Sequence, residues 1–229
     1  MDLSEINFAV LVASLIVAST PLVLAALGEL IVEKSGVLNL GVEGMMIIGA
    51  VTGFIVGVET GSAYIGMMAA AMAGALLSLL FAFIILIMQA NQVASGLALT
   101  IFGLGIAALM GHPYTGIKSP QISTISVPFI SEIPVLGTMF FQHDLIVYLS
   151  LISVLVIWYF LNRMRAGLIL RSVGEDHDVA HSLGYRVVTI RFLAITFGGA
   201  MAGVGGGYLS LVRVPQWTCL LYTSDAADE

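Results

Sequence analysis

The sequence has few charged residues and a single cysteine for its length. Only 10% of its 229 residues are Asp, Glu, Lys or Arg, whereas about a quarter of the residues in soluble domains are charged. Cys219 has no second cysteine with which to form an internal disulfide. The eight Lys and Arg residues form no basic stripe of the kind that binds nucleic acid. A soluble domain, an internal disulfide and a nucleic-acid-binding surface are therefore excluded.

Signatures of catalysis are also missing. The chain has neither the HExxH pattern of zinc proteases nor the GxSxG turn of serine hydrolases. All four histidines fall in predicted loops, so no membrane span offers a base to a serine such as Ser95. The stretch 28–35 is close to a phosphate-binding loop, but Glu33 stands where the second glycine is needed. We expect no enzymatic activity, no bound ATP or other cofactor, and no metal site.

What the sequence does have is long apolar runs. Hydrophobic residues make up 59% of the chain, and the mean hydropathy is +1.05. Runs long enough to cross a bilayer recur, without the alternation of a membrane barrel. The fold class predicted is an all-α, polytopic transmembrane bundle, with spans at about 8–27, 36–58, 63–88, 93–110, 145–161 and 192–211.

The connections between these spans differ in character. Residues 28–35 are predicted to be an interfacial link and residues 89–92 a tight turn. The stretch 112–144 contains four of the six prolines and is predicted to be an exposed external loop, with room for a short surface helix. Pro21 removes one hydrogen bond within the first span and predicts a kink there.

Basic residues indicate the orientation of the bundle. Five of the eight Lys and Arg residues lie in the loop 163–191, which places that loop in the cytoplasm. Counting back over five spans puts the N-terminus and the loop 112–144 outside. The N-terminus has no basic residue ahead of the first apolar run, so we expect the first span to be retained.

The cytoplasmic loop 163–191 has the signals of a short helix. Asp176 can accept hydrogen bonds from the first free N–H groups of a helix, and Gly184 can take the left-handed conformation that ends one. They predict a water-exposed helix of about two turns, tied at both ends to membrane spans. Such a helix is suited to transmit a push from outside the membrane. The alternative is an ordinary loop whose charges only fix the topology.

Polar residues at membrane depth are the candidates for a solute pathway. Asn39 and Glu43 are four residues apart, which would place them on one helical face. A carboxylate inside a span costs several kcal/mol unless it is paired, protonated or near water. Glu43 either lines a pathway or gate, or lies near the interface bound to backbone or to Lys34. Asn91 and Gln92 either line the inner mouth of a pathway or form a simple polar turn.

The sixth predicted span carries glycines at every fourth position. Gly199, Gly203 and Gly207 form a small-residue stripe that lets another helix approach closely. We favour tight packing within one subunit over a contact between subunits.

Three stretches of the sequence, 20–50, 90–103 and 171–211, together resemble the permease subunits of bacterial ABC importers. The branch in question is the nucleoside and simple-sugar branch of the branched-chain amino acid and ribose permease superfamily. The resemblance covers residues 20–218. It implies a permease domain over 1–218 in a chain truncated at its C-terminus, and the tail 219–229 looks foreign to the family.

The resemblance also implies partners and a coupling segment. Permeases of this kind work with ATP-hydrolysing subunits that bind the ATP, a second permease subunit and an extracytoplasmic solute-binding lipoprotein, in the bacterial cytoplasmic membrane. His177 and Asp178 replace a proline and small residues that are usual in the family. The residues expected to couple to the ATPase are Gly174, Glu175, Asp176, Ala180, Leu183 and Gly184.

Two other functions stay open. A secondary transporter driven by an ion gradient would need a buried carboxylate that binds and releases a cation, and Glu43 is the one candidate within a predicted span. A structural membrane protein without a transport role is the third possibility. The leading expectation is an importer permease that forms the pathway for a nucleoside or a simple sugar.

Overall fold

The computed structural model describes residues 8–120, 125–126 and 142–213. In this part of the chain, six helices are long and apolar enough to cross a membrane, so the predicted all-α bundle of six spans is confirmed. Two of them continue into a π-helical turn, α3 into η2 and α9 into η4. The six are α1 (Phe8–Lys34), α2 (Val42–Thr60), α3 (Ala63–Ala82) with η2 (Phe83–Ile87), α4 (Gln92–Gly111), α6 (Leu145–Arg163) and α9 (Val187–Tyr208) with η4 (Leu209–Arg213).

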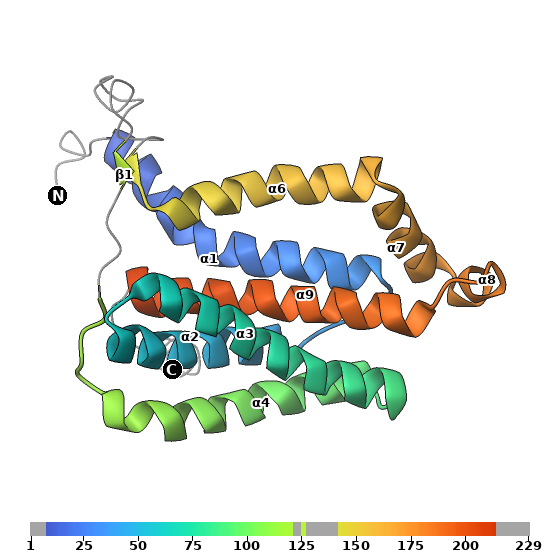
Figure 1. Cartoon of the computed structure of the whole chain (residues 1–229), viewed down its shortest axis with the longest axis horizontal. Helices are drawn as coiled ribbons and strands as arrows, with labels where there is room; N and C mark the ends of the chain where they lie inside the picture. The colour runs from blue at the N-terminus through green and yellow to red at the C-terminus, as the bar shows by residue number, and fades with distance from the viewer. Residues whose placement is uncertain (1–7, 121–124, 127–141, 214–229) are drawn as a thin grey trace.

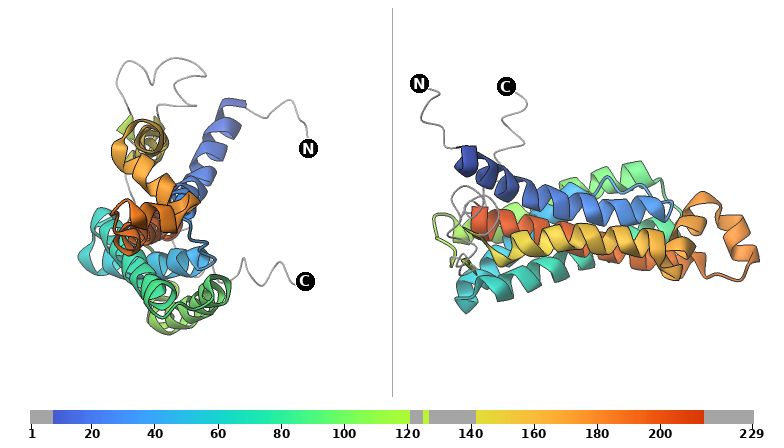
Figure 2. Two further views of the ribbon diagram at one scale, coloured as in Figure 1. Left: turned by 90° about the vertical axis from the view of Figure 1, so that its right-hand side faces the viewer. Right: turned by 90° about the horizontal axis from the view of Figure 1, so that it is seen from above.

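Helix α9 lies in the middle of the bundle. It packs against α1, α2 and α3, with α6 beyond α1 on one side and α4 beyond α2 and α3 on the other (Figure 1). Two short helices, α7 (Arg165–Glu175) and α8 (His177–Ser182), project from one end. The views in Figure 2 show the same elongated bundle from its α7–α8 end and from above.

Little of the loop predicted at 112–144 is described. It begins with a single 3₁₀ turn, η3 (His112–Tyr114). Two short strands, β1 (Ile125–Ser126) and β2 (Gln142–His143), pair antiparallel within it. The short surface helix expected in this loop and the tail 219–229 fall outside the described residues.

The first span is longer than predicted. The stretch 28–35 was expected to be an interfacial link, but α1 runs on through it to Lys34. Its apolar residues explain the difference, because Ile31 and Val32 are buried and pack on neighbouring helices. Glu33 and Lys34 lie on the exposed side of the same helix. Pro21 lies inside α1, and the N-terminal part of α1 bends away from the bundle (Figure 2).

The second and sixth spans also begin elsewhere than predicted. Helix α2 starts at Val42, not at residue 36, and Gly36 has a positive φ of 82°. The prediction that Asn39 and Glu43 share a helical face is therefore wrong, because Asn39 precedes the helix. Helix α9 starts at Val187, so Arg191 belongs to the span and not to the loop 163–191.

The glycine stripe of α9 packs inside this chain, as favoured from the sequence. A Cβ atom at Gly203 would overlap the carbonyl oxygen of Ala70 in α3, and one at Gly199 would overlap Ser78. Gly207 lies against Ala70 and Met67 of α3. Small residues let the backbones of two helices come close together. Such close packing drives helix association in lipid, where the hydrophobic effect does not.

At the end opposite α7 and α8, a buried carboxyl group lies beside the start of α6. The hydroxyl of Tyr208 donates to Asp144 Oδ2 at 3.4 Å. Burial raises the pKa of Asp144 above its ordinary value, while the Tyr208 hydrogen bond and the charge of His143 act in the opposite direction. The Tyr208 contact links the end of α9 to the start of α6.

Gly203→Val should destabilise the bundle by about 1–3 kcal/mol, because the added methyl groups force α9 and α3 apart. The measurement is thermal unfolding of the purified chain in mild detergent. Gly105→Val in α4 is the matched control, since a side chain there meets nothing within 4 Å. Equal unfolding temperatures for the two variants would contradict the close packing of α9.

Candidate functional site at the α7–α8 end of the bundle

The short exposed helix predicted in the loop 163–191 is present as α8. Asp176 caps its start, with Oδ1 accepting hydrogen bonds from the N–H groups of Asp178 and Val179, both at 3.0 Å. Gly184 follows its end with a φ of +88°. The Gly184 N–H donates to the backbone carbonyl of His181, and the Tyr185 N–H donates to the backbone carbonyl of Ala180. These two bonds form the Schellman pattern. Both ends of α8 are thus held by the residues that the sequence indicated.

A second helix in this loop, α7, was not predicted. Its buried residues Gly167, Leu170 and Val173 are three apart, which is a helical spacing that the sequence does display. Leu170 packs with Ile31, Ile157 and other residues of α1, α6 and α9. Helix α7 is therefore bound to the bundle along one side.

Helix α8 extends beyond the bundle (Figure 1). Apolar side chains on it and just after it are exposed. Val179 is 54% exposed and Leu183 69%, whereas Ala180 is 1% exposed. Glu175 and Asp176 are exposed beside them. Of the six residues expected to couple to a partner, Gly174 is half-buried and Ala180 is buried, and the exposed ones are Glu175, Asp176, Leu183 and Gly184.

Gly174 instead lies where α7 meets the end of α1. A Cβ atom on Gly174 would overlap the carbonyl oxygen of Lys34 and come within 3.0 Å of the Gly36 nitrogen. From α9, Arg191 Nε donates to the Ser35 carbonyl at 3.0 Å, and Nη2 to the Val173 carbonyl at 3.5 Å. We call these contacts the Arg191 junction, which consists of Ser35, Gly36, Val173, Gly174 and Arg191.

From this junction the chain runs back into the bundle as a non-helical segment, residues 35–41. The Leu38 N–H donates to Oε1 of Gln92, the first residue of α4, at 2.8 Å. The Thr100 hydroxyl, two turns further along α4, donates to the Leu40 carbonyl at 3.3 Å. The segment therefore descends along α4 before α2 begins.

Side chains satisfy the backbone of this segment. The Asn39 N–H donates to Glu29 Oε1 at 3.1 Å, and the Gly41 N–H to Asn39 Oδ1 at 3.0 Å. Asn39 itself is 2% exposed. Non-helical backbone inside a membrane protein persists only where such partners exist or where it lines a water-filled cavity.

The other polar candidates have separate positions. Asn91 caps α4, with Oδ1 accepting from the N–H groups of Val93 and Ala94. Glu43 is exposed in the first turn of α2 and forms no ion pair with Lys34 in the described part of the chain. The side chains of Asn39 and Gln92 thus both accept hydrogen bonds from backbone N–H groups of the segment 35–41. The Asn91 side chain instead caps α4, and Glu43 lies in α2.

Sequence reasoning missed two residues here. Glu29 was assigned to an interfacial link, yet it accepts the Asn39 hydrogen bond, and within the described residues its Oε2 is buried without a partner. The sequence places Arg191 in a water-exposed loop, whereas in the structure it belongs to α9. No local sequence signal identifies either role, because each depends on a partner brought close by the fold.

Comparison with known proteins identifies relatives over most of the chain. A putative glucose ABC transporter permease protein of Haloferax volcanii, TsgC13, is 39% identical over 204 residues, covering 87% of this chain and 62% of the relative. The guanosine ABC transporter permease protein NupQ of Bacillus subtilis is 35% identical, covering 93% and 71%. The nucleoside ABC transporter permease protein NupC of Lactococcus lactis is 33% identical, covering 86% and 66%.

The chain thus spans about two thirds of the length of these relatives. No solved structure matches it significantly. Residues 11–220 match the family described as the branched-chain amino acid transport system permease component. With its six apolar helices, the chain is a multi-pass membrane protein that belongs to this permease family.

Proposed function

We propose that this chain is the membrane-spanning permease subunit of an ATP-binding-cassette importer. It would form part of the translocation pathway for a nucleoside or a simple sugar. The printed names of three relatives support this substrate class, since they are permeases for glucose, guanosine and nucleosides. These solutes share a ring with several hydroxyl groups.

The observation that carries the proposal is the connection from α8 to the inside of the bundle. Helix α8 presents exposed Val179 and Leu183 beside exposed acidic residues, and exposed apolar side chains in water favour a protein contact. Helix α7 joins it to the Arg191 junction. The junction holds the segment 35–41, which leads into α2 and along α4.

A mechanism follows from this connection. A separate ATPase that binds ATP and closes would push on α8 and carry α7 with it. The movement reaches the segment 35–41 through Gly174 and Arg191. Within it, residues 38–40 make no backbone–backbone hydrogen bond in the described structure, so they can shift without unwinding a helix. The bundle would then change from outward to inward access, and the solute would not be chemically altered.

The partners follow from the same proposal. One ATP-hydrolysing subunit would bind at α8 and a second would bind the other permease subunit, which would complete the pathway. An extracytoplasmic solute-binding lipoprotein would deliver the solute. The complex would lie in the cytoplasmic membrane with α7 and α8 inside the cell. Six of the eight Lys and Arg residues lie at that end, in agreement with the positive-inside rule.

An ion-gradient transporter has less support. Such a transporter needs a buried carboxylate that binds and releases a cation, but the candidate Glu43 is exposed in the first turn of α2. Among carboxylates in the described spans, Glu29 is more enclosed, but one of its oxygens is engaged by the Asn39 N–H. The relatives reported above are all ATP-binding-cassette permeases by name.

The direct test is transport by the assembled complex in sealed vesicles, with labelled guanosine and labelled glucose. We expect uptake only when the ATPase subunits and ATP are both present. Uptake that persists without the ATPase, and that stops when an ion gradient is collapsed, would overturn the proposal.

Gly184→Val should reduce uptake per ATP hydrolysed by about tenfold, because a β-branched residue at a φ of +88° distorts the end of α8. The Cβ atom meets nothing within 4 Å, so any effect comes from the backbone. Gly61→Val is the matched control: Gly61 has a φ of +67°, is equally open and ends α2 at the opposite end of the bundle. Equal transport by the two variants would show that α8 does not transmit the signal.

Arg191→Met should lower uptake per ATP hydrolysed by about tenfold, because it removes the two hydrogen bonds that the charged guanidinium donates. Arg191→Lys, which keeps the charge and a donor, should restore part of the coupling. Uptake and ATP hydrolysis are measured together, with thermal unfolding as the check on stability. If uptake and hydrolysis fall in equal proportion in both variants, the junction is structural only.

A further inference from the structure

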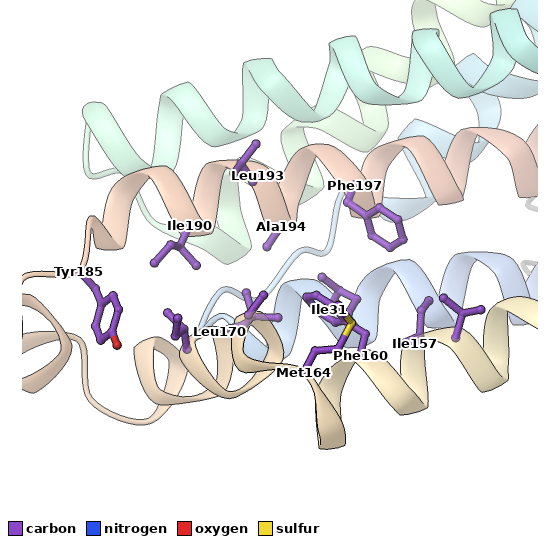
Figure 3. A pocket seen from close by; sticks show the side chains of 13 residues that line it. Ile31, Ile157, Phe160, Met164, Leu170, Tyr185, Ile190, Leu193, Ala194 and Phe197 are labelled. Atoms are coloured by element: carbon purple, nitrogen blue, oxygen red, sulfur yellow. The ribbon is translucent and has the colours of Figure 1, made fainter.

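An apolar groove of about 560 Å³ lies on the surface at the α7–α8 end of the bundle. It is bounded by α6, α7, α9 and the end of α1 (Figure 3). Ile31, Phe160, Leu170 and Ala194 contribute to its walls, and every lining side chain is apolar apart from the hydroxyl of Tyr185. None of the polar residues of the Arg191 junction lines it.

The groove is open toward the lipid-facing side of the helices. Val156 on α6 is 58% exposed, and Leu193 and Phe197 on α9 are 65% and 42% exposed. These residues belong to spans, so the groove opens at membrane depth on the apolar outside of the described bundle. Whatever fills it must therefore be apolar along its length.

Three exposed arginines adjoin groove-lining residues in the chain, and none forms an ion pair with a carboxylate within the described residues. Arg163 and Arg165 flank Met164, which lines the groove, and Arg186 follows Tyr185, which also lines it. All three arginines are exposed. The only ion pair in the described residues is His177–Asp178, so no carboxylate neutralises them there.

The shape of the walls favours a flexible occupant over another helix. Helices that pack closely in membranes meet through small residues, as α9 and α3 do here. The groove is lined mainly by branched and aromatic side chains, which keep a second backbone at a distance. A hydrocarbon chain can follow such an irregular wall.

We propose that the groove is the binding site of an anionic phospholipid from the leaflet at the α7–α8 end. One acyl chain lies between α6, α7 and α9, and the phosphate lies among Arg163, Arg165 and Arg186. Basic residues beside a pocket between membrane helices recognise anionic headgroups in this way. This inference does not depend on the transport proposal, because it rests on the groove and its charges alone.

The test is native mass spectrometry of the purified chain in mild detergent. Phosphatidylglycerol and phosphatidylcholine with identical acyl chains are titrated separately. We expect one tight site that prefers phosphatidylglycerol. Replacing Arg163, Arg165 and Arg186 by Gln should weaken phosphatidylglycerol binding by roughly fivefold for each arginine and leave phosphatidylcholine binding unchanged.

A second variant tests the apolar part of the site. Ala166→Trp places a large side chain at an exposed position that lines the groove, and should weaken binding of both lipids by about tenfold. Lys118→Gln controls for loss of a charge elsewhere, and Ala98→Trp controls for an added tryptophan on the exposed face of α4. Neither control should alter binding of either lipid.

Two outcomes would overturn the proposal. The first is phosphatidylglycerol binding that is unaffected by both the arginine and the Ala166 variants. The second is the absence of a preferred lipid together with dimers that Ala166→Trp disrupts and Ala98→Trp does not, since a second copy would then occupy the groove.

Discussion

The structure depends on satisfying backbone hydrogen bonds inside an apolar bundle. A helix does this for itself, but residues 35–41 do not form a helix. Their N–H and carbonyl groups are engaged by side chains from three helices: Glu29 of α1, Gln92 and Thr100 of α4, and Arg191 of α9. An unpaired group at such a place costs several kcal/mol. These polar side chains therefore fix the positions of α1, α4 and α9 relative to one another.

Close helix packing is the second constraint, and it places α9 at the centre. Glycines on one face of α9 pack closely against α3, and on another face Gly198 packs against Gly28 of α1. Because α9 also begins at the Arg191 junction, the same helix carries the tightest packing and the contact with α7. A displacement at α7 therefore reaches a helix that three others contact.

The spans could be predicted because an apolar run of some twenty residues leaves the chain few alternatives. The ends of α8 could be predicted because Asp176 and Gly184 act on neighbouring residues. The end of α1 was misplaced because Glu33 and Lys34 look like a link, although Ile31 and Val32 on the same turn are buried. The break at residues 35–41 could not be predicted, since the partners of Leu38 and Ser35 are 54 and 156 residues away in the chain.

That separation also bears on how the protein is made. Ser35 enters the membrane region long before Arg191 is synthesised, because Arg191 follows it by 156 residues in the chain. Until then the Ser35 carbonyl lacks the guanidinium that binds it in the finished bundle. The α1–α2 connection can therefore complete its hydrogen bonds only after residue 191 has been synthesised.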